Sequence, residues 1–396
     1  MSEELNRYQL YVEPPKEILR PLQLPVKTLT GPGPSNCSER VLRALQHQTI
    51  GHLHPEICQL MDEIKAGLQY LFQTKNRLTL VVSASGHGGM EACLGNLVER
   101  GETVLIARAA LWSERVADMV DRIGGHAEFL ETDSITGFTL EQLESALEKY
   151  RPSAVFVVHG ETCSGRKQPL VGVADLIHKY NALLIVDTVA SLGGEPFFMD
   201  AWGVDAVYTG TQKALAAPSG LAPLSLSARA EKKLFSRRTR IPVFYWDLTI
   251  LGDYWACFGR DRVYHHTISA TLVYGLREAL SLLCEEGLVA SWARHAAAAA
   301  RLRKGLELRG LRFYVKIPQY RLSTVVAIEV PPGIDGKLVS KRAMDKFKVE
   351  ISQGLGPTSG KVLRIGMMGV NATEHQADLV LTALDEGLKY ALEAKL

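Results

Sequence analysis

The 396-residue sequence predicts an α/β protein with two domains: a large domain with a mostly parallel sheet covered by helices, then a smaller C-terminal α+β domain. Short apolar runs alternate with helix-like stretches from residue 78 to residue 210, as parallel strands buried on both faces require. After about residue 285 the alternation gives way to a long Ala- and Arg-rich helix and a few separate elements. We therefore expect an N-terminal arm (1–20), a large domain (21–285) and a small domain (286–396).

Five apolar runs are the expected strands of the large domain: 78–85, 103–107, 154–160, 182–187 and 206–210. Apolar residues at helical spacing predict helices over 139–150 and 172–180. The small domain is expected to contain a helix over 288–310, strands over 324–330 and 362–368, and a closing helix over 374–396. Prolines and glycines in 24–36 indicate a rigid, ordered loop. In such a fold, ligands bind at the carboxyl ends of the parallel strands.

The composition favours a soluble protein with a small ligand. A net charge of +2, without a basic stripe or an acidic tail, disfavours nucleic acid or a membrane surface as the main partner. The six cysteines are scattered and form no Cys-x-x-Cys pair, which disfavours a disulfide framework and a zinc site and suits a reducing compartment. No signal peptide is expected, and no apolar run approaches the roughly 18 residues of a membrane helix.

Lys213 is the one amine in an apolar segment, DAVYTGTQKALAAPSG (205–220). Most single lysines are solvated and have no chemical role, so its neighbours in the fold decide its function. Desolvation in an apolar loop disfavours the ammonium form and makes such an amine easier to deprotonate.

Three more features follow strands of the same domain. The stretch VVSASGHGGMEACLGNL (81–97) runs from a strand through a glycine-rich turn into a helix, and would leave free N–H groups for one phosphate at Gly86, His87 and Gly88. A tight turn without a ligand would use the same glycines. Asp187 ends a buried strand, where its carboxylate needs a cation or strong donors unless it caps the next segment. Trp112 could stack on a flat ring or belong to the core.

Together these features match the needs of pyridoxal 5′-phosphate. Lys213 would form the imine, and Asp187 would keep the pyridine nitrogen protonated so that the ring acts as an electron sink, while the turn would hold the phosphate. The glycine spacing matches neither G-x-G-x-x-G nor the P-loop, so a dinucleotide or a nucleoside triphosphate is not favoured.

Arg364 and a histidine pair are the remaining candidates. In VLRIGMM (362–368), a period of two puts Arg364 beside Gly366, which leaves room for a ligand carboxylate on the guanidinium. The alternative is a salt bridge within the small domain. His265 and His266 are adjacent on extended chain and should point to opposite sides, so we expect both to be structural and no metal to bind.

The chain also resembles the class V, fold-type I pyridoxal-phosphate aminotransferases, and within them the alanine–glyoxylate (serine–pyruvate) and 3-hydroxykynurenine transaminases. The resemblance covers nearly the whole chain through GPGPSN (31–36), SGHGGMEA (85–92), HGETCSG (159–165), VDTVASLGG (186–194), GTQKALAAPSG (210–220), YHHT (264–267) and GLGPTSGKVLRIGMMG (354–369). It implies a homodimer with shared active sites.

The resemblance also implies a role for individual residues. Lys213 would be the Schiff-base lysine, Asp187 the partner of the pyridinium and Trp112 the residue stacked on the ring. The other implied cofactor contacts are Ser85, Gly86, His87 and Gln212 around the phosphate end, Thr162 near the ring hydroxyl, and Tyr264 and Thr267 at the phosphate of the neighbouring subunit. Arg364 would bind the substrate carboxylate, and Ser35 and Asn36 would also contact the substrate.

The implied reaction moves the amino group of alanine or serine to glyoxylate, giving glycine and pyruvate or hydroxypyruvate. The stiff GPGPSN loop favours such a compact acceptor. A 3-hydroxykynurenine transaminase is the alternative within the family. A lyase or desulfurase is less favoured, because no cysteine lies in a recognisable catalytic loop. A catalytically silent binding protein of the same fold is a distant alternative, which intact Lys213, Asp187 and Arg364 disfavour.

The sequence departs from the family pattern at three positions. Gln353 replaces a glycine and would narrow or reshape the substrate entrance, whereas Thr162 and Thr211 replace serines and keep the hydroxyl.

The chain ends in Ala-Lys-Leu, which resembles the peroxisomal signal Ser-Lys-Leu. The sequence therefore predicts import into peroxisomes by the receptor for that signal, with the cytoplasm as the alternative. The same three residues also finish an amphipathic helix.

Overall fold

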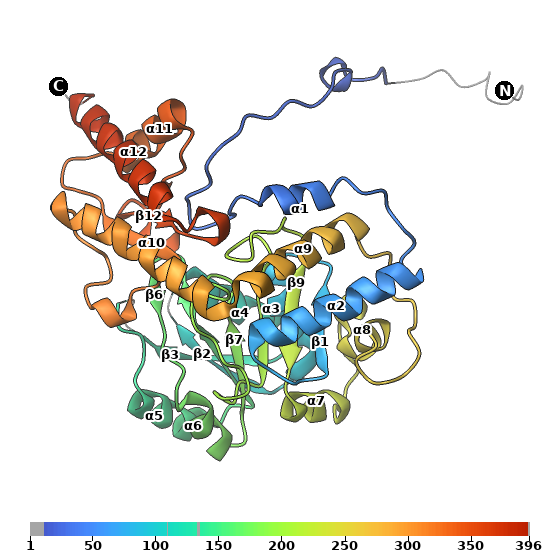
Figure 1. Ribbon diagram of the computed structural model, residues 1–396. Coiled ribbons are helices and arrows are strands. Elements are labelled where there is room, and N and C mark those ends of the chain that lie inside the picture. The colour runs from blue at the N-terminus through green and yellow to red at the C-terminus, as the bar shows by residue number, and fades with distance from the viewer. Residues whose placement is uncertain (1–11, 109, 133–134, 395–396) are drawn as a thin grey trace, which may run out of the picture.

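Seven strands form the central sheet in the order β1-β9-β8-β7-β4-β2-β3 (Figure 1). The computed structural model describes residues 12–108, 110–132 and 135–394. The strands are β1 (Leu78–Val82), β2 (Thr103–Arg108), β3 (His126–Glu131), β4 (Ala154–Val158), β7 (Leu183–Asp187), β8 (Ala206–Tyr208) and β9 (Ala222–Leu226). β3, β2, β4, β7 and β8 pair in parallel, while β9 runs antiparallel to both β8 and β1.

All five expected strands of the large domain are present, and the predicted fold class is confirmed. β1, β4, β7 and β8 are buried at every position, as strands covered on both faces must be. Two strands of the central sheet were not predicted. β3 is partly exposed and has no continuous apolar run, and β9 contains Pro223 and Ser225.

The helices of the large domain pack on the sheet, each against one or two particular strands. α2 contacts β1, α3 contacts β8 and β9, α4 contacts β2 and β3, and α6 contacts β7. The large-domain helices are α1 (Glu39–Ala44), α2 (Pro55–Phe72), α3 (Gly86–Leu97), α4 (Leu111–Arg122), α5 (Leu140–Tyr150), α6 (Val173–Lys179), α7 (Ala228–Phe235), α8 (Leu248–Tyr254) and α9 (Ala270–Glu286). α5 begins with a capping box, in which Thr139 and Gln142 satisfy each other's backbone N–H groups.

The C-terminal elements surround a second core. Their bounds are α10 (Leu288–Leu308), β10 (Val325–Glu329), α11 (Gly336–Phe347), β11 (Ser352–Gln353), β12 (Val362–Gly366) and α12 (Glu374–Glu393). The strands form an antiparallel sheet in the order β10-β12-β11. Leu302, Ile328, Ile365 and Leu384 bring α10, both long strands and α12 into one buried cluster. A short ribbon, β5 (Gly160–Glu161) with β6 (Arg166–Lys167), follows β4.

The N-terminal segment leaves the body of the molecule (Figure 1). Residues 12–27 are exposed throughout, and the chain joins the small domain at Thr28, whose N–H donates to the Lys348 carbonyl at 2.8 Å. Thr30 then donates to the Glu350 carbonyl at 2.8 Å, so the segment from Thr28 onward is ordered against the body. Residues 1–11 of the expected arm lie outside the described residues.

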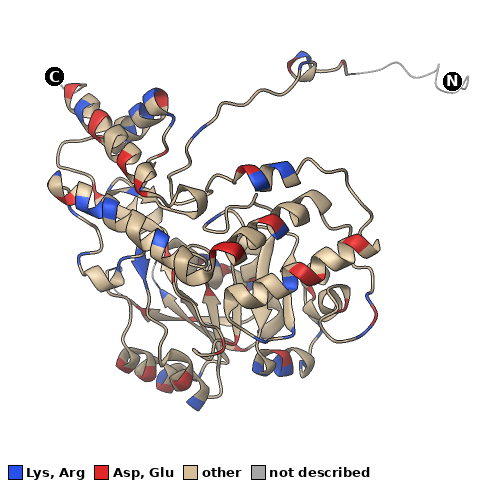
Figure 2. Ribbon diagram, viewed as in Figure 1, with Lys and Arg blue, Asp and Glu red and all other residues tan. Residues whose placement is uncertain are grey.

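Acidic and basic residues interleave along the outer helices (Figure 2). Two ion pairs connect α10 to α12: Arg301 with Asp378 at 2.8 Å and Arg309 with Asp385 at 2.6 Å. Over residues 12–394, apart from the three undescribed positions, no helix combines the length and the apolar character needed to cross a membrane.

Candidate active site

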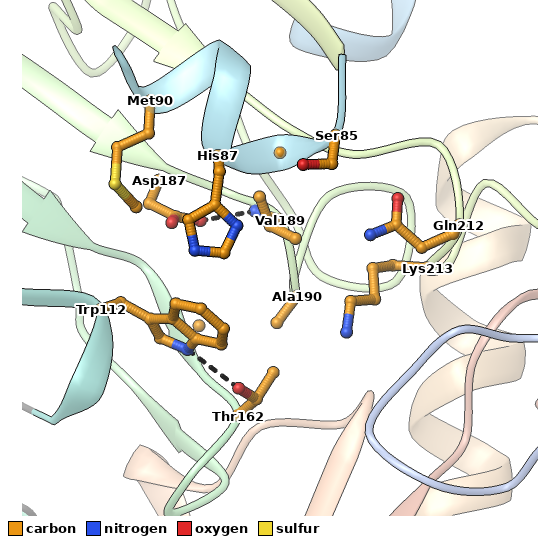
Figure 3. A pocket seen from close by; sticks show the side chains of 12 residues that line it. Ser85, His87, Met90, Trp112, Thr162, Asp187, Val189, Ala190, Gln212 and Lys213 are labelled. Atoms are coloured by element: carbon orange, nitrogen blue, oxygen red, sulfur yellow. Dashed lines mark hydrogen bonds between the residues drawn. The ribbon is translucent and has the colours of Figure 1, made fainter. Parts of the chain in front are cut away.

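One cavity of about 540 Å³ gathers eight of the residues that the sequence predicts as cofactor contacts. Its lining consists of Ser85, Gly86, His87, Met90, Trp112, Gly160, Thr162, Asp187, Val189, Ala190, Gln212 and Lys213 (Figure 3). These residues come from the carboxyl ends of the parallel strands and the turns that follow them, where an α/β sheet binds its ligands.

Lys213 lies in the connection between β8 and β9, which is anchored at both ends. The N–H of Thr209 donates to the Pro223 carbonyl at 2.9 Å, and that of Thr211 to the Leu221 carbonyl at 3.3 Å. The amine donates to the Pro32 carbonyl at 2.5 Å. Burial, and then the charge of Arg364, lower the pKa of Lys213 to about 8. A free amine is therefore much more accessible here than at a solvated lysine.

Asp187 ends β7 and turns its carboxylate into the cavity. Oδ1 accepts from the Val189 N–H at 2.8 Å, and Oδ2 accepts from the Tyr208 hydroxyl at 2.5 Å. The carboxylate thus caps the following turn, as one interpretation of the sequence held, and it also lines the cavity. Burial raises the pKa of Asp187 to about 6, although the hydrogen bond from Tyr208 opposes this. A cationic ligand group beside it would favour the ionised form.

The amino end of α3 supplies an anion site at the cavity. Ser85 is the N-cap residue, but its side chain makes no capping hydrogen bond. Within the described residues no partner takes the N–H groups of Gly86 and His87, which open the first helical turn. The prediction that Gly88 also offers a free N–H was wrong, because this group donates to the Ser85 carbonyl at 2.8 Å.

Trp112 forms one wall of the cavity. Its indole N–H donates to the Thr162 hydroxyl at 3.0 Å, and the edge of its ring system meets His87 with centroids 5.5 Å apart (Figure 3). Burial, and then the charge of Arg115, lower the pKa of His87. The indole therefore borders open space and does not belong only to the core.

Arg364 is buried on β12 and is oriented by two backbone carbonyls. Nε donates to Gln353 at 2.7 Å, and Nη1 donates to Thr162 at 3.2 Å. It makes no ion pair within the described residues, so the alternative of a small-domain salt bridge is wrong. Thr162 thus connects this guanidinium to Trp112 and the cavity. The effect of the Gln353 side chain on the substrate entrance stays a prediction.

Ser35 and Asn36 are not among the cavity residues. The Ser35 hydroxyl donates to the Lys213 carbonyl at 2.6 Å, and its N–H donates to the Gln212 carbonyl at 2.8 Å. The Asn36 amide accepts from the Leu29 N–H at 2.8 Å and donates to the Lys27 carbonyl at 3.0 Å. The Ser35 bonds hold the 27–36 loop against the segment that carries Lys213, and the Asn36 bonds stabilise the loop itself.

Tyr264 and Thr267 also lie outside this cavity. Both are exposed, and their hydroxyl oxygens are 3.5 Å apart. Between them, His265 and His266 do not point to opposite sides as the sequence analysis expected: their Nδ1 atoms are 2.9 Å apart, because the chain is not regular strand here. His266 also bonds to the Ser83 hydroxyl at 2.6 Å. Among the described residues no group of three or more His, Cys, Asp or Glu side chains could hold a metal ion.

Sequence reasoning missed five contributors to the site. Met90, Gly160, Val189 and Ala190 line the cavity, and Tyr208 holds Asp187 from behind. Four of them are apolar or small and carry no chemical signal in a sequence. Tyr208 could have been noticed as the polar tip at the end of a buried strand, one strand away from Asp187.

A covered α/β sheet with a half-buried lysine, a strand-end aspartate and an uncapped helix at one cavity defines an enzyme of the fold-type I transferase class. The class-V aminotransferase family matches residues 30–380, and the chain belongs to that family. It is 47% identical to alanine–glyoxylate aminotransferase from Drosophila melanogaster over 379 residues, 96% of each chain.

Two further relatives extend the comparison. The crystal structure of alanine–glyoxylate aminotransferase from Nostoc sp. superimposes with a TM-score of 0.91 at 42% identity, covering 98% of this chain and 100% of that one. The (S)-ureidoglycine–glyoxylate transaminase of Bacillus subtilis is 34% identical over 92% of this chain and 91% of its own.

Proposed function

We propose that this aminotransferase moves the amino group of alanine or serine to glyoxylate, giving glycine and pyruvate or hydroxypyruvate. The observation that carries the proposal is the shared cavity of Lys213, Asp187 and the amino end of α3, with Arg364 joined to it through Thr162. Relatives at 42–47% identity over nearly the full length bear the name alanine–glyoxylate aminotransferase.

The cavity suits pyridoxal 5′-phosphate, which the family implies. The open N–H groups of Gly86 and His87 would take its phosphate, together with the Ser85 hydroxyl and the side-chain amide N–H groups of Gln212, which also line the cavity. Asp187 would meet the protonated ring nitrogen, since its buried carboxylate needs added positive charge. When bound, this cofactor supplies an electron sink for the substrate α-carbon.

The side chains of the chain itself would do the binding and the proton transfer. Arg364, held by two carbonyls, would grip the substrate carboxylate in a fixed plane. Lys213, with its pKa of about 8, would take the proton from the α-carbon and return it, because such an amine exists in both forms near neutral pH. Trp112 would cover one face of the ring and keep water from it.

Steady-state kinetics over a small matrix of donors and acceptors test the proposal. We expect kcat/KM for alanine with glyoxylate to exceed that for 3-hydroxykynurenine with glyoxylate. The opposite order would make the chain a 3-hydroxykynurenine transaminase, and an absence of transamination in a folded, cofactor-loaded protein would favour the silent binding protein.

We further propose a homodimer with shared sites. Tyr264 and Thr267 are exposed and lie outside the cavity of their own chain, which supports a contact with the phosphate in a partner subunit. Lys213→Ala and Tyr264→Ala subunits, mixed as heterodimers, should recover part of the activity, since one of the two sites then contains neither substitution. Heterodimers verified by mass that stay inactive would refute the sharing.

Two further proposals concern the domain organisation and the cellular localisation of the protein. The two separate cores support a boundary near residue 285, with the cavity in the large domain and Arg364 in the small one. We also propose import into peroxisomes through the terminal Ala-Lys-Leu, of which Lys395 and Leu396 lie outside the described residues. Removing the three residues should leave a tagged protein in the cytosol with unchanged kinetics. A full-length protein with a free C-terminus that stays in the cytosol would contradict peroxisomal import.

A further inference from the structure

Glu350 lies just before β11, on the same face of the small sheet as Arg364. Ser352 pairs with Arg364 across β11 and β12, so their side chains share a face. Alternation along the chain puts Glu350 on that face too, and the Ser352 hydroxyl donates to Glu350 Oε1 at 3.0 Å. The carboxylate is therefore directed to the side on which Arg364 acts.

The Glu350 carboxylate touches the loop that also touches Lys213. A Cβ at Gly31 would lie 2.4 Å from Glu350 Oε1, and a Cβ at Gly33 would lie 2.3 Å from Lys213 Nζ. Between the two glycines, Pro32 accepts the hydrogen bond from Lys213. Because neither glycine has a side chain, both charged groups can approach the backbone of this three-residue segment closely, from Gly31 to Gly33.

Glu350 is a half-buried carboxylate with an uncancelled charge. Within the described residues, no basic side chain reaches it at ion-pair distance, and the Ser352 hydroxyl is the side-chain donor that it accepts from. Burial lowers the pKa of Lys213 and that of Arg364, and the charge of Glu350 opposes the shift in both cases. Its negative field therefore extends into the space between the amine and the guanidinium.

We infer that Glu350 is a specificity-determining residue: its carboxylate disfavours amino acids and oxo-acids that carry a second carboxylate. The inference rests on the proposed function, which puts the first carboxylate of a substrate on Arg364 and its reacting carbon beside Lys213. A second carboxylate would then be held in the same enclosed site. At an effective dielectric constant of about 20, any two like charges within about 10 Å of each other weaken binding by at least about tenfold.

Aspartate and asparagine separate charge from size and form the test. In the cofactor-loaded wild type, with glyoxylate as acceptor, we expect a higher kcat/KM for asparagine than for aspartate. Glu350→Gln keeps the shape and removes the charge, so the asparagine-to-aspartate ratio should fall by about tenfold. Glu350→Asp retains the charge and should keep the ratio nearer to that of the wild type. A uniform loss of activity cancels in this ratio.

A second measurement does not depend on turnover. Calorimetric titration should show that Glu350→Gln binds succinate about tenfold more tightly than the wild type does, while binding of the monoamide of succinate changes little. Asp345→Asn, which removes one exposed charge from α11, is the matched control and should leave both ratios at wild-type values.

The outcomes separate the two proposals. An unchanged asparagine-to-aspartate ratio, with unchanged succinate binding, in a folded and cofactor-loaded Glu350→Gln protein would overturn the role of Glu350. A wild type that does not convert alanine and glyoxylate would refute the proposed function, and the succinate comparison would still decide whether Glu350 repels a second carboxylate.

Discussion

Tyr208 sets the charge on Asp187 through one hydrogen bond. The 2.5 Å bond to Oδ2 favours the ionised carboxylate, whereas burial favours the protonated form. Tyr208→Phe keeps the ring in the core and removes the bond, so the pKa of Asp187 should rise further above its value of about 6. Pyridoxal phosphate should then bind the apoenzyme more weakly near neutral pH. In a plot of cofactor affinity against pH, the acidic limb should move to higher pH by about one unit.

Titration of apoenzyme with the cofactor over a series of pH values measures this limb. Tyr254→Phe is the control, because it removes another buried hydroxyl, one that donates to the His52 carbonyl at 3.3 Å, far from Asp187 in the sequence. A limb that does not move in Tyr208→Phe would show that the hydrogen bond has no influence on the carboxylate.

Lys213→Ala should abolish turnover with little effect on folding. The amine combines two proposed tasks, attachment of the cofactor and proton transfer, so its loss should lower kcat by at least about a thousandfold. The amine is partly buried and, within the part of the chain that the structure describes, bonds to the Pro32 carbonyl alone, so its removal should not destabilise the core. Turnover assays and thermal melting measure both effects, and turnover near the wild-type rate would exclude Lys213 as the catalytic amine.

The site residues that could be predicted are charged side chains in apolar segments of the sequence. Lys213 in an apolar loop, Asp187 at a buried strand end and Arg364 in an apolar strand are each costly unless they meet a partner. Glu350 gave no such signal, because a charged residue that alternates with apolar ones, here between Val349 and Ile351, is ordinary for a strand with one face toward solvent. Its importance depends on contacts with Gly31 and Ser352, which chain folding alone brings about.

At the scale of elements, α3 offers a matched pair of glycines. A Cβ at Gly88 would lie 2.2 Å from the Ala84 Cβ, within the turn that forms the anion site, whereas a Cβ at Gly95 meets nothing within 4 Å. Gly88→Ala should therefore displace the turn and weaken cofactor binding by at least about tenfold, a cost of about 1.4 kcal/mol. Gly95→Ala should stabilise the protein by about 0.5–1 kcal/mol, since alanine is the better helix former.

Cofactor titration and urea unfolding of both variants distinguish these effects. Equal cofactor affinity in Gly88→Ala and Gly95→Ala would mean that the turn tolerates a side chain and that the close contact at Ala84 does not matter.

The sequence predicted elements wherever their burial matched their apolar pattern. β1, β4 and β7 are buried over their whole length and read as continuous apolar runs. β3, at the edge of the sheet, is half exposed, and β9 follows β8 after the connection 209–221 and pairs antiparallel with it. Periodicity cannot reveal such a pairing, because it arises from the register of the neighbouring strands.

At the scale of the whole molecule, two buried histidines make stability depend on pH. Burial lowers the pKa of His159 and of His295 to about 4 from 6.5, because both are almost fully enclosed. The unfolded chain therefore binds more protons between about pH 4 and about pH 6.5, and the free energy of unfolding rises with pH through that window. Asp187, whose pKa is raised to about 6 by burial, acts in the opposite direction and reduces this gain.

His295→Gln should flatten this dependence. In the wild type, Nδ1 donates to the Ser291 carbonyl at 2.7 Å and Nε2 accepts from the Gly369 N–H at 3.0 Å, an arrangement that only the neutral ring allows. Urea unfolding of the apoprotein near the two ends of the window measures the slope. A slope equal to that of the wild type would mean that His295 does not titrate differently on folding.

The antiparallel return from β8 to β9 has a consequence for synthesis of the chain. Every residue that lines the cavity lies between positions 85 and 213, and the β8–β9 connection closes the Lys213 segment as soon as Leu226 has been made. Arg364 and Glu350 are made much later, with the small domain. Because domains fold as units during translation, we expect the half with the proposed cofactor site to form on the ribosome before the half that carries Arg364 and Glu350 exists.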